Sequence, residues 1–540
     1  MPINPTYPGV YVEELESSVH PIVGVQTSKT AFIGRAKTGP RDKATTIHSF
    51  EEYVRIFGGL SRDSSMSYAV YQYFLNGGAD AIIVAIDDNA KPDSLVRKFT
   101  LTGTAASDGL HFESLDVGKV NKGFSVVVEQ NKDATDLVNL HVKTYYDTSI
   151  KFADWLKESS TLESFYRLAL PDTSPHSIRQ VLKDNSKYIN IKKGDVVDST
   201  TTSAKSVGVY QAEEKGAEGT PADTIANELT RIIPEDRKAK KGIYALDDVD
   251  IFNILCIPPL QQSVGKNKVE LDIPSGVYSS ALKYCKDKRA ILIIDPPKTW
   301  NTKSKPLETT TGIDVTFGSL RDKNAAIFFP RILAPDPLDG YALREFVPCG
   351  FVAGVMARTD VDRGVWKAPA GIQAGIAGAS SLTVKLTDAE NGELNPIGIN
   401  CLRIKPPAGI VVWGSRTMRG ADELADQWKY LPVRRLALYL EESLYRGTQW
   451  VVFEPNDERL WAEIRLNVGS FMQDLFTKGA FQGITPKEAY LVKCDHDTTT
   501  QLDIDRGTVN IVVGFAPLKP AEFVILQIKQ LAGHNMEAKV

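Results

Sequence analysis

The stretch LPVRRLALYLEESLYRGTQWVVFEPNDERLWAEIRLNVGSFMQDLFTKGAFQG, residues 431–483, predicts two helices separated by one strand, and the rest of the chain is organised around it. The first helix begins at Pro432, because proline is tolerated in a first turn, and ends at Gly447, where a left-handed cap suits glycine. Its apolar residues recur at helical spacing and form one stripe: Val433, Leu436, Ala437, Leu440 and Leu444.

The residues after Gly447 predict a short strand and then a longer helix. Thr448–Glu454 is rich in β-forming residues and is followed by a proline. Asn456 is a suitable N-cap for the next helix, since asparagine is among the preferred N-cap residues. Acidic residues follow it in the first turn, where the helix dipole favours negative charge. A second apolar stripe continues to Lys478-Gly479: Leu460, Ile464, Val468, Phe471 and Leu475.

Five charged residues lie off the apolar stripe of the first helix: Arg434, Arg435, Glu441, Glu442 and Arg446. We expect them on the outer face of this helix. Such a face is most often solvated surface, but a repeated assembly uses charges of this kind to set the register of its contacts. Both interpretations fit the sequence.

The composition is that of a soluble protein with several domains. The chain has 540 residues, and single cores rarely grow beyond about 250–300 residues. The net charge of −4 gives no sign of a nucleic-acid partner. No apolar run is long enough for a membrane span, and the first ten residues do not resemble a signal peptide. Five scattered cysteines without ligand spacing predict buried, reduced thiols.

Both ends of the chain carry isolated strand patterns. Near the N-terminus, residues alternate within Thr6–Ile22: Val10 and Val12 point one way, Tyr11 and Glu13 the other. Near the C-terminus, Thr508–Phe515 and Ala521–Ile528 predict two strands, the second containing Phe523, Val524, Ile525 and Leu526. A lone terminal strand needs a sheet edge, which either its own domain or a neighbouring molecule can supply.

Short apolar runs separated by helices predict an α/β domain with a largely parallel sheet. The predicted buried strands are Thr30–Gly34, Ala81–Ile86, Val249–Ile257, Ala290–Asp295 and Asn324–Phe329. Phe346–Asp360 predicts a helix of small residues that packs closely against a neighbour. Residues from Ala90 to about Lys240 are polar with short alternating runs, and they predict an inserted, mainly β module.

No group of residues predicts catalysis, and we expect no catalytic, cofactor-binding or metal-binding residue. Asp295 follows a predicted parallel strand, where α/β enzymes keep catalytic groups, but a strand-end turn is the more ordinary role. No histidine lies between Val249 and His496, and no GxSxG, GxGxxG or P-loop motif occurs. Four aspartates, Asp495, Asp497, Asp503 and Asp505, do not match an EF-hand loop.

Several long motifs, in order, resemble the tail sheath proteins of contractile phage tails and of phage-like contractile injection systems. The motifs are TYPGVYVEE (Thr6–Glu14), SFEEYVRIFGG (Ser49–Gly59), NGGADAIIV (Asn76–Val84), GFVAGVMARTDVDRGVWKAPAG (Gly350–Gly371), RRLALYLEESLYRGTQWVVFEPND (Arg434–Asp457) and GFAPLKPAEFVILQI (Gly514–Ile528). The resemblance covers both ends and the middle of the chain and fails in about Ala90–Lys240, where that family is variable.

The resemblance implies a structural protein. Its fold would combine a subtilisin-like α/β domain without catalytic residues, a C-terminal α+β domain completed by terminal arm strands, and an inserted mainly β outer domain. Its subunits would form rings, stacked into a helical sheath around an inner tube protein, with baseplate and terminator or cap proteins at the ends. The two isolated strands would then add to sheets of adjacent subunits, and the five charges of the first helix are candidates for the tube-facing surface.

We therefore expect five regions: an N-terminal linker arm (1–22), the subtilisin-like domain (23–90 and 241–420), the inserted outer domain (91–240), the C-terminal core (421–515) and a C-terminal arm (516–540). Assembly would take place in the bacterial cytoplasm, and the product would be a virion tail or an extracellular or cell-associated injection particle, with no membrane insertion by this chain. The alternatives are another tail or baseplate component and an α/β hydrolase.

Overall fold

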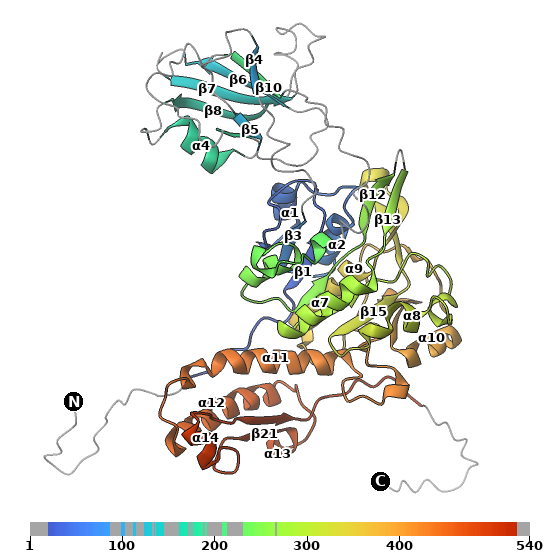
Figure 1. Ribbon diagram of the computed structural model, residues 1–540. Coiled ribbons are helices and arrows are strands. Elements are labelled where there is room, and N and C mark those ends of the chain that lie inside the picture. Colours follow the sequence, from blue (N-terminus) through green and yellow to red (C-terminus); the bar gives the residue numbers. More distant parts are fainter. Residues whose placement is uncertain are drawn as a thin grey trace, which may run out of the picture.

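The computed structural model describes residues 20–86, 230–264 and 267–525, and between 87 and 229 it describes the elements named below with a few adjoining residues. The arm residues Val10, Tyr11, Val12, Glu13 and Leu526 lie outside the described residues. Figure 1 shows a central α/β body, a separate small β module beyond it, and a C-terminal layer that lies across the other end of the body. The fold is a mixed α+β arrangement of several domains.

An eight-stranded sheet forms the centre of the body. Its six inner strands run parallel, and an antiparallel strand closes each edge. In spatial order the strands are β2 (Thr45–Ile47), β3 (Ala81–Ala85), β1 (Thr30–Gly34), β11 (Ile254–Cys256), β14 (Ile291–Ile294), β15 (Ala325–Phe329), β19 (Ile399–Lys405) and β20 (Gly409–Val412). The five predicted strands are present in this sheet, because continuous apolar runs can be buried on both faces of a sheet, but the strand predicted over Val249–Ile257 is limited to Ile254–Cys256.

Helices cover both faces of this sheet. Along β1, Phe32 packs into the core on one face and Ile33 into the core on the other, as the two-residue period of a strand requires. One face is covered by α1 (Phe50–Phe57), α2 (Ser65–Leu75) and α9 (Cys349–Arg363). The other is covered by α7 (Ser275–Asp287), α8 (Ile313–Phe317) and α10 (Asp388–Leu394).

The small residues of α9 allow the close packing that the sequence predicts. A Cβ atom added at Gly350 would lie 2.2 Å from the Ala69 carbonyl oxygen of α2, and one at Gly354 would lie 2.6 Å from the Tyr73 carbonyl oxygen. The helix begins later than predicted, at Cys349, because Pro348 occupies its N-cap position. Helix α9 therefore lies backbone to backbone against α2.

Smaller elements complete the body. A hairpin joins β12 (Leu260–Val264) and β13 (Asn267–Leu271), and a three-stranded sheet has the order β17 (Ala342–Phe346), β16 (Ile332–Asp336) and β18 (Ser381–Leu382). The connections contain the 3₁₀ helices η1 (Arg237–Ala239), η2 (Gly242–Asp248), η3 (Lys305–Leu307), η4 (Gly318–Leu320), η5 (Pro337–Asp339), η6 (Asn395–Ile397) and η7 (Asp422–Leu424).

The segment between β3 and η1 contains the separate β module. Its five-stranded antiparallel sheet has the order β4 (Phe99–Thr102), β10 (Gly208–Ala212), β6 (Phe124–Gln130), β7 (Leu137–Thr144) and β8 (Thr161–Ala169). A second pair joins β5 (Phe112–Ser114) and β9 (Ile189–Ile191). Helix α4 (Ile178–Asn185) buries Ile178 and Leu182 against Val126 and Leu140 of the sheet, which gives the module its own core.

The C-terminal layer contains α11 (Leu431–Gly447), η8 (Gln449–Val451), α12 (Glu458–Thr477), α13 (Pro486–Ala489), β21 (Tyr490–Lys493), α14 (Gln501–Asp505) and β22 (Val512–Phe515). Strands β21 and β22 pair antiparallel. The N-cap of α12 is Asp457 rather than Asn456, and its side chain accepts a hydrogen bond from the Leu460 backbone N–H. No helix within the described ranges combines the length and the apolar character needed to cross a membrane.

Three strand predictions in this layer are wrong or too long. Thr448–Glu454 forms the 3₁₀ helix η8 and a turn, because the chain reverses there from α11 into α12, and this segment belongs to none of the sheets formed by the described residues. The strand predicted over Thr508–Phe515 is limited to Val512–Phe515. Residues 521–525 have no strand assignment, and the remainder of the strand predicted over Ala521–Ile528 lies outside the described residues.

Candidate assembly site

The first and last described residues lie beside α11, at opposite ends of that helix (Figure 1). At the N-terminal side, the His20 ring stacks on Trp450 with ring centroids 4.4 Å apart, and the His20 backbone N–H donates to Asn467 Oδ1 at 3.2 Å. The Val25 backbone N–H donates to Ser443 Oγ at 3.2 Å. The described chain therefore enters along the C-terminal half of α11.

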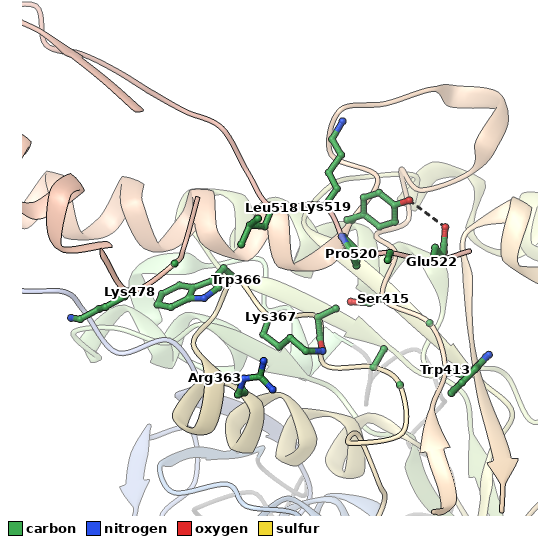
Figure 2. A pocket seen from close by; sticks show the side chains of 17 residues that line it. Arg363, Trp366, Lys367, Trp413, Ser415, Lys478, Leu518, Lys519, Pro520 and Glu522 are labelled. Carbon is green, nitrogen blue, oxygen red and sulfur yellow. Dashed lines mark hydrogen bonds between the residues drawn. The ribbon is translucent and has the colours of Figure 1, made fainter. Parts of the chain in front are cut away.

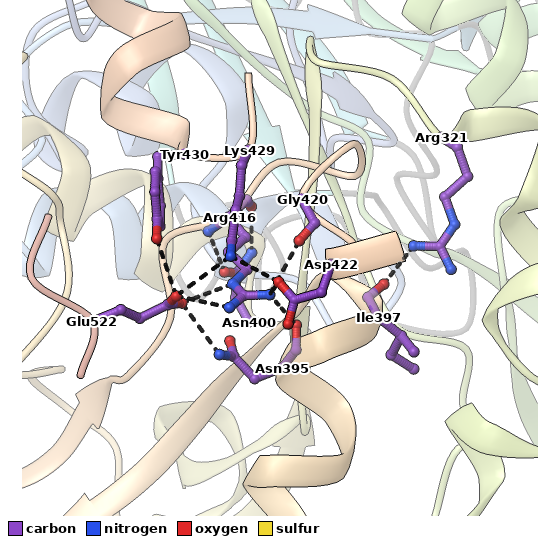
Figure 3. Close-up of polar contacts among 10 residues, drawn as sticks. All are labelled: Arg321, Asn395, Ile397, Asn400, Arg416, Gly420, Asp422, Lys429, Tyr430 and Glu522. Carbon is purple, nitrogen blue, oxygen red and sulfur yellow. Dashed lines mark hydrogen bonds and ion pairs between the residues drawn. The ribbon is translucent and has the colours of Figure 1, made fainter. Parts of the chain in front are cut away.

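The C-terminal segment leaves β22 and crosses to the beginning of α11. The Gln482 backbone N–H donates to the Ala516 carbonyl at 2.9 Å, and the Ala516 backbone N–H donates to the Ala489 carbonyl at 2.8 Å. The segment then reaches the body at Glu522, where one carboxylate meets a buried arginine (Figure 3).

Arg416 holds Glu522 in a two-point ion pair. Its Nε donates to Oε1 of Glu522 and its Nη2 donates to Oε2, both at 2.7 Å. Asn395 Nδ2 donates to Oε1 at 3.2 Å, and the Tyr430 hydroxyl donates to Oε2 at 3.3 Å. We call these residues, with Asp422, the arm clamp.

The residues that bind this carboxylate belong to the body. The Arg416 side chain is fully buried, and its Nη1 donates to the carbonyls of Asn395 and Gly420 and to Asp422 Oδ1. Burial alone would raise the pKa of Glu522, but the hydrogen bonds and positive charge of Arg416 outweigh it, so the pKa lies below its ordinary value. Glu522 is therefore a carboxylate at neutral pH.

The residues directly after the clamp are apolar and exposed. Phe523, Val524 and Ile525 have relative exposures of 73%, 79% and 83%. Three apolar side chains in water next to a fixed carboxylate are what a segment that docks elsewhere would present. The sequence identified these three as arm residues but did not single out Glu522, whose signal is a lone carboxylate at the start of an apolar run.

The expectation of an exposed charged face on α11 is wrong for Arg434 and Arg435. Both side chains are buried, at 6% and 4% exposure. Arg434 donates from Nε to Asn324 Oδ1 at 3.0 Å and from Nη1 to Glu441 Oε1 at 3.0 Å. Arg435 forms a two-point ion pair with buried Asp360 at 2.8 and 2.5 Å.

The other three charges expected on this face also have partners inside the chain: Glu441 is exposed and pairs with Arg434, and Glu442 and Arg446 pair as follows. Glu442 accepts from Arg289 at 2.6 Å and from Arg446 at 2.7 Å, and Arg446 donates to Asp250 Oδ2 at 2.8 Å. Helix α11 carries these internal pairs because it is packed on two sides: Leu431 and Leu438 belong to the core of the body, and Leu436 and Leu440 to the core of the C-terminal layer. The two leucines Leu431 and Leu438, off the predicted stripe, were the sequence signal for this second buried side.

Asp295 is a buried strand-end aspartate. Its Oδ1 accepts a hydrogen bond from the Cys349 backbone N–H at 3.0 Å, and its Oδ2 is buried without a partner. Burial is the main cause that raises the pKa of Asp295 to about 7. Cys349 is itself buried, and burial keeps its thiol pKa well above the ordinary value, so the thiol is a poor nucleophile.

A cavity of about 610 Å³ lies next to the arm clamp, between the end of α9 and residues 518–522. Figure 2 shows Arg363, Trp366 and Lys367 on one border and Leu518, Pro520 and Glu522 on the other. Trp413, Tyr430, Lys478 and Lys519 also line it. Aromatic walls and lysines at the edge suit an apolar group that carries a negative neighbour.

Two family models match this chain. The model of the phage tail sheath protein central domain matches residues 278–418, and the model of the phage tail sheath C-terminal domain matches residues 424–530. The first ends just after Arg416 and the second contains Glu522, so the arm clamp joins the two matched domains.

Relatives and a solved structure agree with these matches. The chain is 28% identical over 184 residues to the tail sheath protein of Vibrio phage KVP40, covering 34% of this chain and 26% of that protein. It is 25% identical over 236 residues to a putative prophage major tail sheath protein of Pseudomonas aeruginosa, covering 43% and 56%. Its fold is similar to the sheath complex of an extracellular contractile injection system in the contracted state, with a TM-score of 0.54, 20% identity and coverage of 98% and 99%. The chain spans about a quarter of the Vibrio phage protein and about half of the Pseudomonas protein. Residues 278–418 and 424–530 therefore match the central and C-terminal domains of phage tail sheath proteins, and the chain is similar to that family in sequence and in fold.

Proposed function

We propose that this chain is a structural sheath subunit that polymerises around an inner tube and contracts to drive the tube through a target cell envelope. The observation that carries the proposal is that His20 and Glu522, close to the two limits of the described chain, are held at opposite ends of α11. A subunit with donor segments on opposite sides makes heterologous contacts, and these build an open helical assembly when the rotation does not close.

The C-terminal sheet gives the donor segments a place to bind. In the described residues it consists of β21 and β22 alone, with Leu491 and Val512 about half exposed. An isolated pair of strands is marginally stable, and added strands would complete its backbone hydrogen bonds. The arms of adjacent subunits, including Val10–Glu13 and Phe523–Leu526, are the proposed additional strands.

Contraction would then be a rigid-body rotation of subunits while the arms stay paired. The body is proposed to be subtilisin-like in topology and without enzymatic activity. The buried position of Asp295 and of the Cys349 thiol supports that proposal. An inner tube, baseplate and terminator proteins are the proposed partners, and a phage tail or an injection particle assembled in the bacterial cytoplasm is the proposed location.

The tube contact is proposed for the outer face of α12 rather than for Arg434 and Arg435, which are inside the molecule. Arg459 and Asp474 of α12 and Lys478 at its C-cap are exposed, and exposed ion pairs are weak singly, about 0–1 kcal/mol. Weak contacts repeated over many subunits can hold an extended sheath and still release it one ring at a time.

Truncation of either arm tests the proposal. The full chain should form cylinders visible by negative-stain microscopy, whereas chains lacking residues 1–19 or 523–540 should stay folded by circular dichroism and form none. A full-length chain that stays monomeric at every concentration would overturn the proposal, and so would truncated chains that form cylinders of normal length. A peptidase assay of the wild type and of Asp295→Ala tests the hydrolase alternative.

A further inference from the structure

The turn between α11 and α12 presents an apolar tip, Val452 and Phe453, to solvent. The Phe453 side chain is fully exposed, at 102% of its reference value, and Val452 is exposed at 59%. The backbone of Phe453 has φ +73°, a left-handed conformation that bulky residues rarely adopt. Strain of this kind persists only where the surrounding structure enforces it, and it accumulates at sites with a function.

Two backbone hydrogen bonds fix the turn that carries the tip. The Val452 backbone N–H donates to the Gln449 carbonyl at 3.3 Å, and the Glu454 backbone N–H donates to the Val451 carbonyl at 3.2 Å. Beneath the tip, Trp450 and Val451 pack against the core of the C-terminal layer. A rigid aromatic side chain loses little conformational entropy on binding, which is the property of an interface anchor.

The cavity beside the arm clamp has the matching chemistry. Its apolar wall is formed by Trp366, Trp413, Leu518 and Pro520 (Figure 2). Its volume of about 610 Å³ is large enough for an aromatic side chain. Arg363, Lys367, Lys478 and Lys519 make its border basic, whereas the charge of Glu522 is compensated by Arg416.

The tip is acidic where the cavity is basic. Exposed Glu454 directly follows Phe453, and exposed Asp457 begins α12. Within one chain the two features cannot meet, because they lie at opposite ends of α11, whose 17 residues span about 25 Å at roughly 1.5 Å per residue.

We propose that the apolar tip of one subunit inserts Phe453 into the Trp366–Trp413 cavity of a second copy of this chain. The contact is heterologous, so each copy offers one tip and one cavity and the contact propagates from subunit to subunit. It deepens the proposed sheath function, on which it rests, by adding a side-chain contact that is separate from arm-strand pairing.

Cysteine cross-linking tests this contact in the full chain. Val452→Cys and Lys519→Cys place one thiol beside the tip and one at the cavity border while keeping Phe453 and both tryptophans, and the five native cysteines are buried. With a bismaleimide linker much shorter than α11, assembled double variant should give a ladder of covalent multimers. Each single variant should still assemble but give no covalent multimers, and an equimolar mixture of the two single variants should give covalent dimers.

A second variant measures how much the Phe453 side chain contributes to assembly. Phe453→Ser should raise the critical concentration for cylinder formation at least tenfold without lowering the melting temperature, because the side chain is fully exposed within the subunit. Leu502→Ser, an exposed apolar residue on α14, is the matched control and should change neither quantity. Cylinders that form normally without cross-links and with Phe453→Ser would overturn this contact alone. Absence of cylinders from the wild-type chain would overturn the proposed function with it.

Discussion

Removing the carboxylate of Glu522 should free the C-terminal arm while leaving the body folded. In Glu522→Gln, the charge that meets Arg416 is lost and at most one of the two 2.7 Å hydrogen bonds can be replaced. Hydrogen bonds to charged groups contribute about 1.5–3 kcal/mol each. The free energy lost in Glu522→Gln should lie toward the lower end of this range, because Asp422 still pairs with Arg416 at 3.0 Å.

A loss of about 2 kcal/mol increases the open population of the arm roughly thirtyfold, since about 1.4 kcal/mol corresponds to a factor of ten. The population can be measured with a nitroxide label at Val524→Cys, two residues beyond the clamp. All five native cysteines are buried, so the introduced thiol is the one that reacts. In the wild-type background at neutral pH we expect a restricted spectrum, and in Glu522→Gln a predominantly mobile one.

The pH dependence provides an independent check of the same clamp. The pKa of Glu522 is lowered in the folded protein, so its contribution to stability is complete above the ordinary glutamate pKa of about 4.3 and is lost as pH falls through the lower folded value. The label should therefore stay restricted from pH 7 down to the ordinary glutamate pKa and become mobile as pH falls below that value, through the lower folded pKa. Glu423→Gln, which removes an exposed carboxylate in the neighbouring turn η7, is the matched control. Equal restriction in Glu522→Gln and wild type would refute the clamp.

Three further predictions concern the body. Arg435→Met should lower the free energy of unfolding, measured by urea denaturation, by about 3–5 kcal/mol, because it leaves Asp360 buried and unpaired. The double variant Arg435→Met, Asp360→Leu should recover most of this loss. A double variant as unstable as Arg435→Met would contradict this account. Gly350→Ala should lower the free energy of unfolding by about 1–3 kcal/mol, because the added methyl group overpacks against α2. Gly276→Ala is the control, since its added Cβ meets open space, and it should not lower the free energy of unfolding. Equal losses in the two variants would contradict the close packing of α9 on α2. Because the folded pKa of Asp295 is about 7, stability should fall as pH rises from about 4 to 7, by at most about 4 kcal/mol, and Asp295→Asn should remove that part of the slope in denaturation series at several pH values.

The sequence alone determined the parts of this protein that follow from local periodicity. The apolar runs of β1, β3, β14 and β15 predicted buried parallel strands, because a strand covered on both faces needs no polar positions. The small residues of α9 predicted close packing for a similar local reason. The resemblance to tail sheath proteins rested on motifs spread over both ends and the middle of the chain.

The tertiary structure decided which surfaces of those elements face water. Helix α11 has a clear apolar stripe, but Arg434 and Arg435, which lie off that stripe, are also buried, because the body packs against them and supplies Asn324 and Asp360 as their partners. Thr448–Glu454 has strand-forming residues but forms a turn, since the chain must reverse there from α11 into α12, and the segment joins no sheet of the described residues. The arm clamp joins residues 106 positions apart, and no local pattern relates them. An ion pair of this kind depends on the position of two backbones in space, and only the folded chain fixes that position.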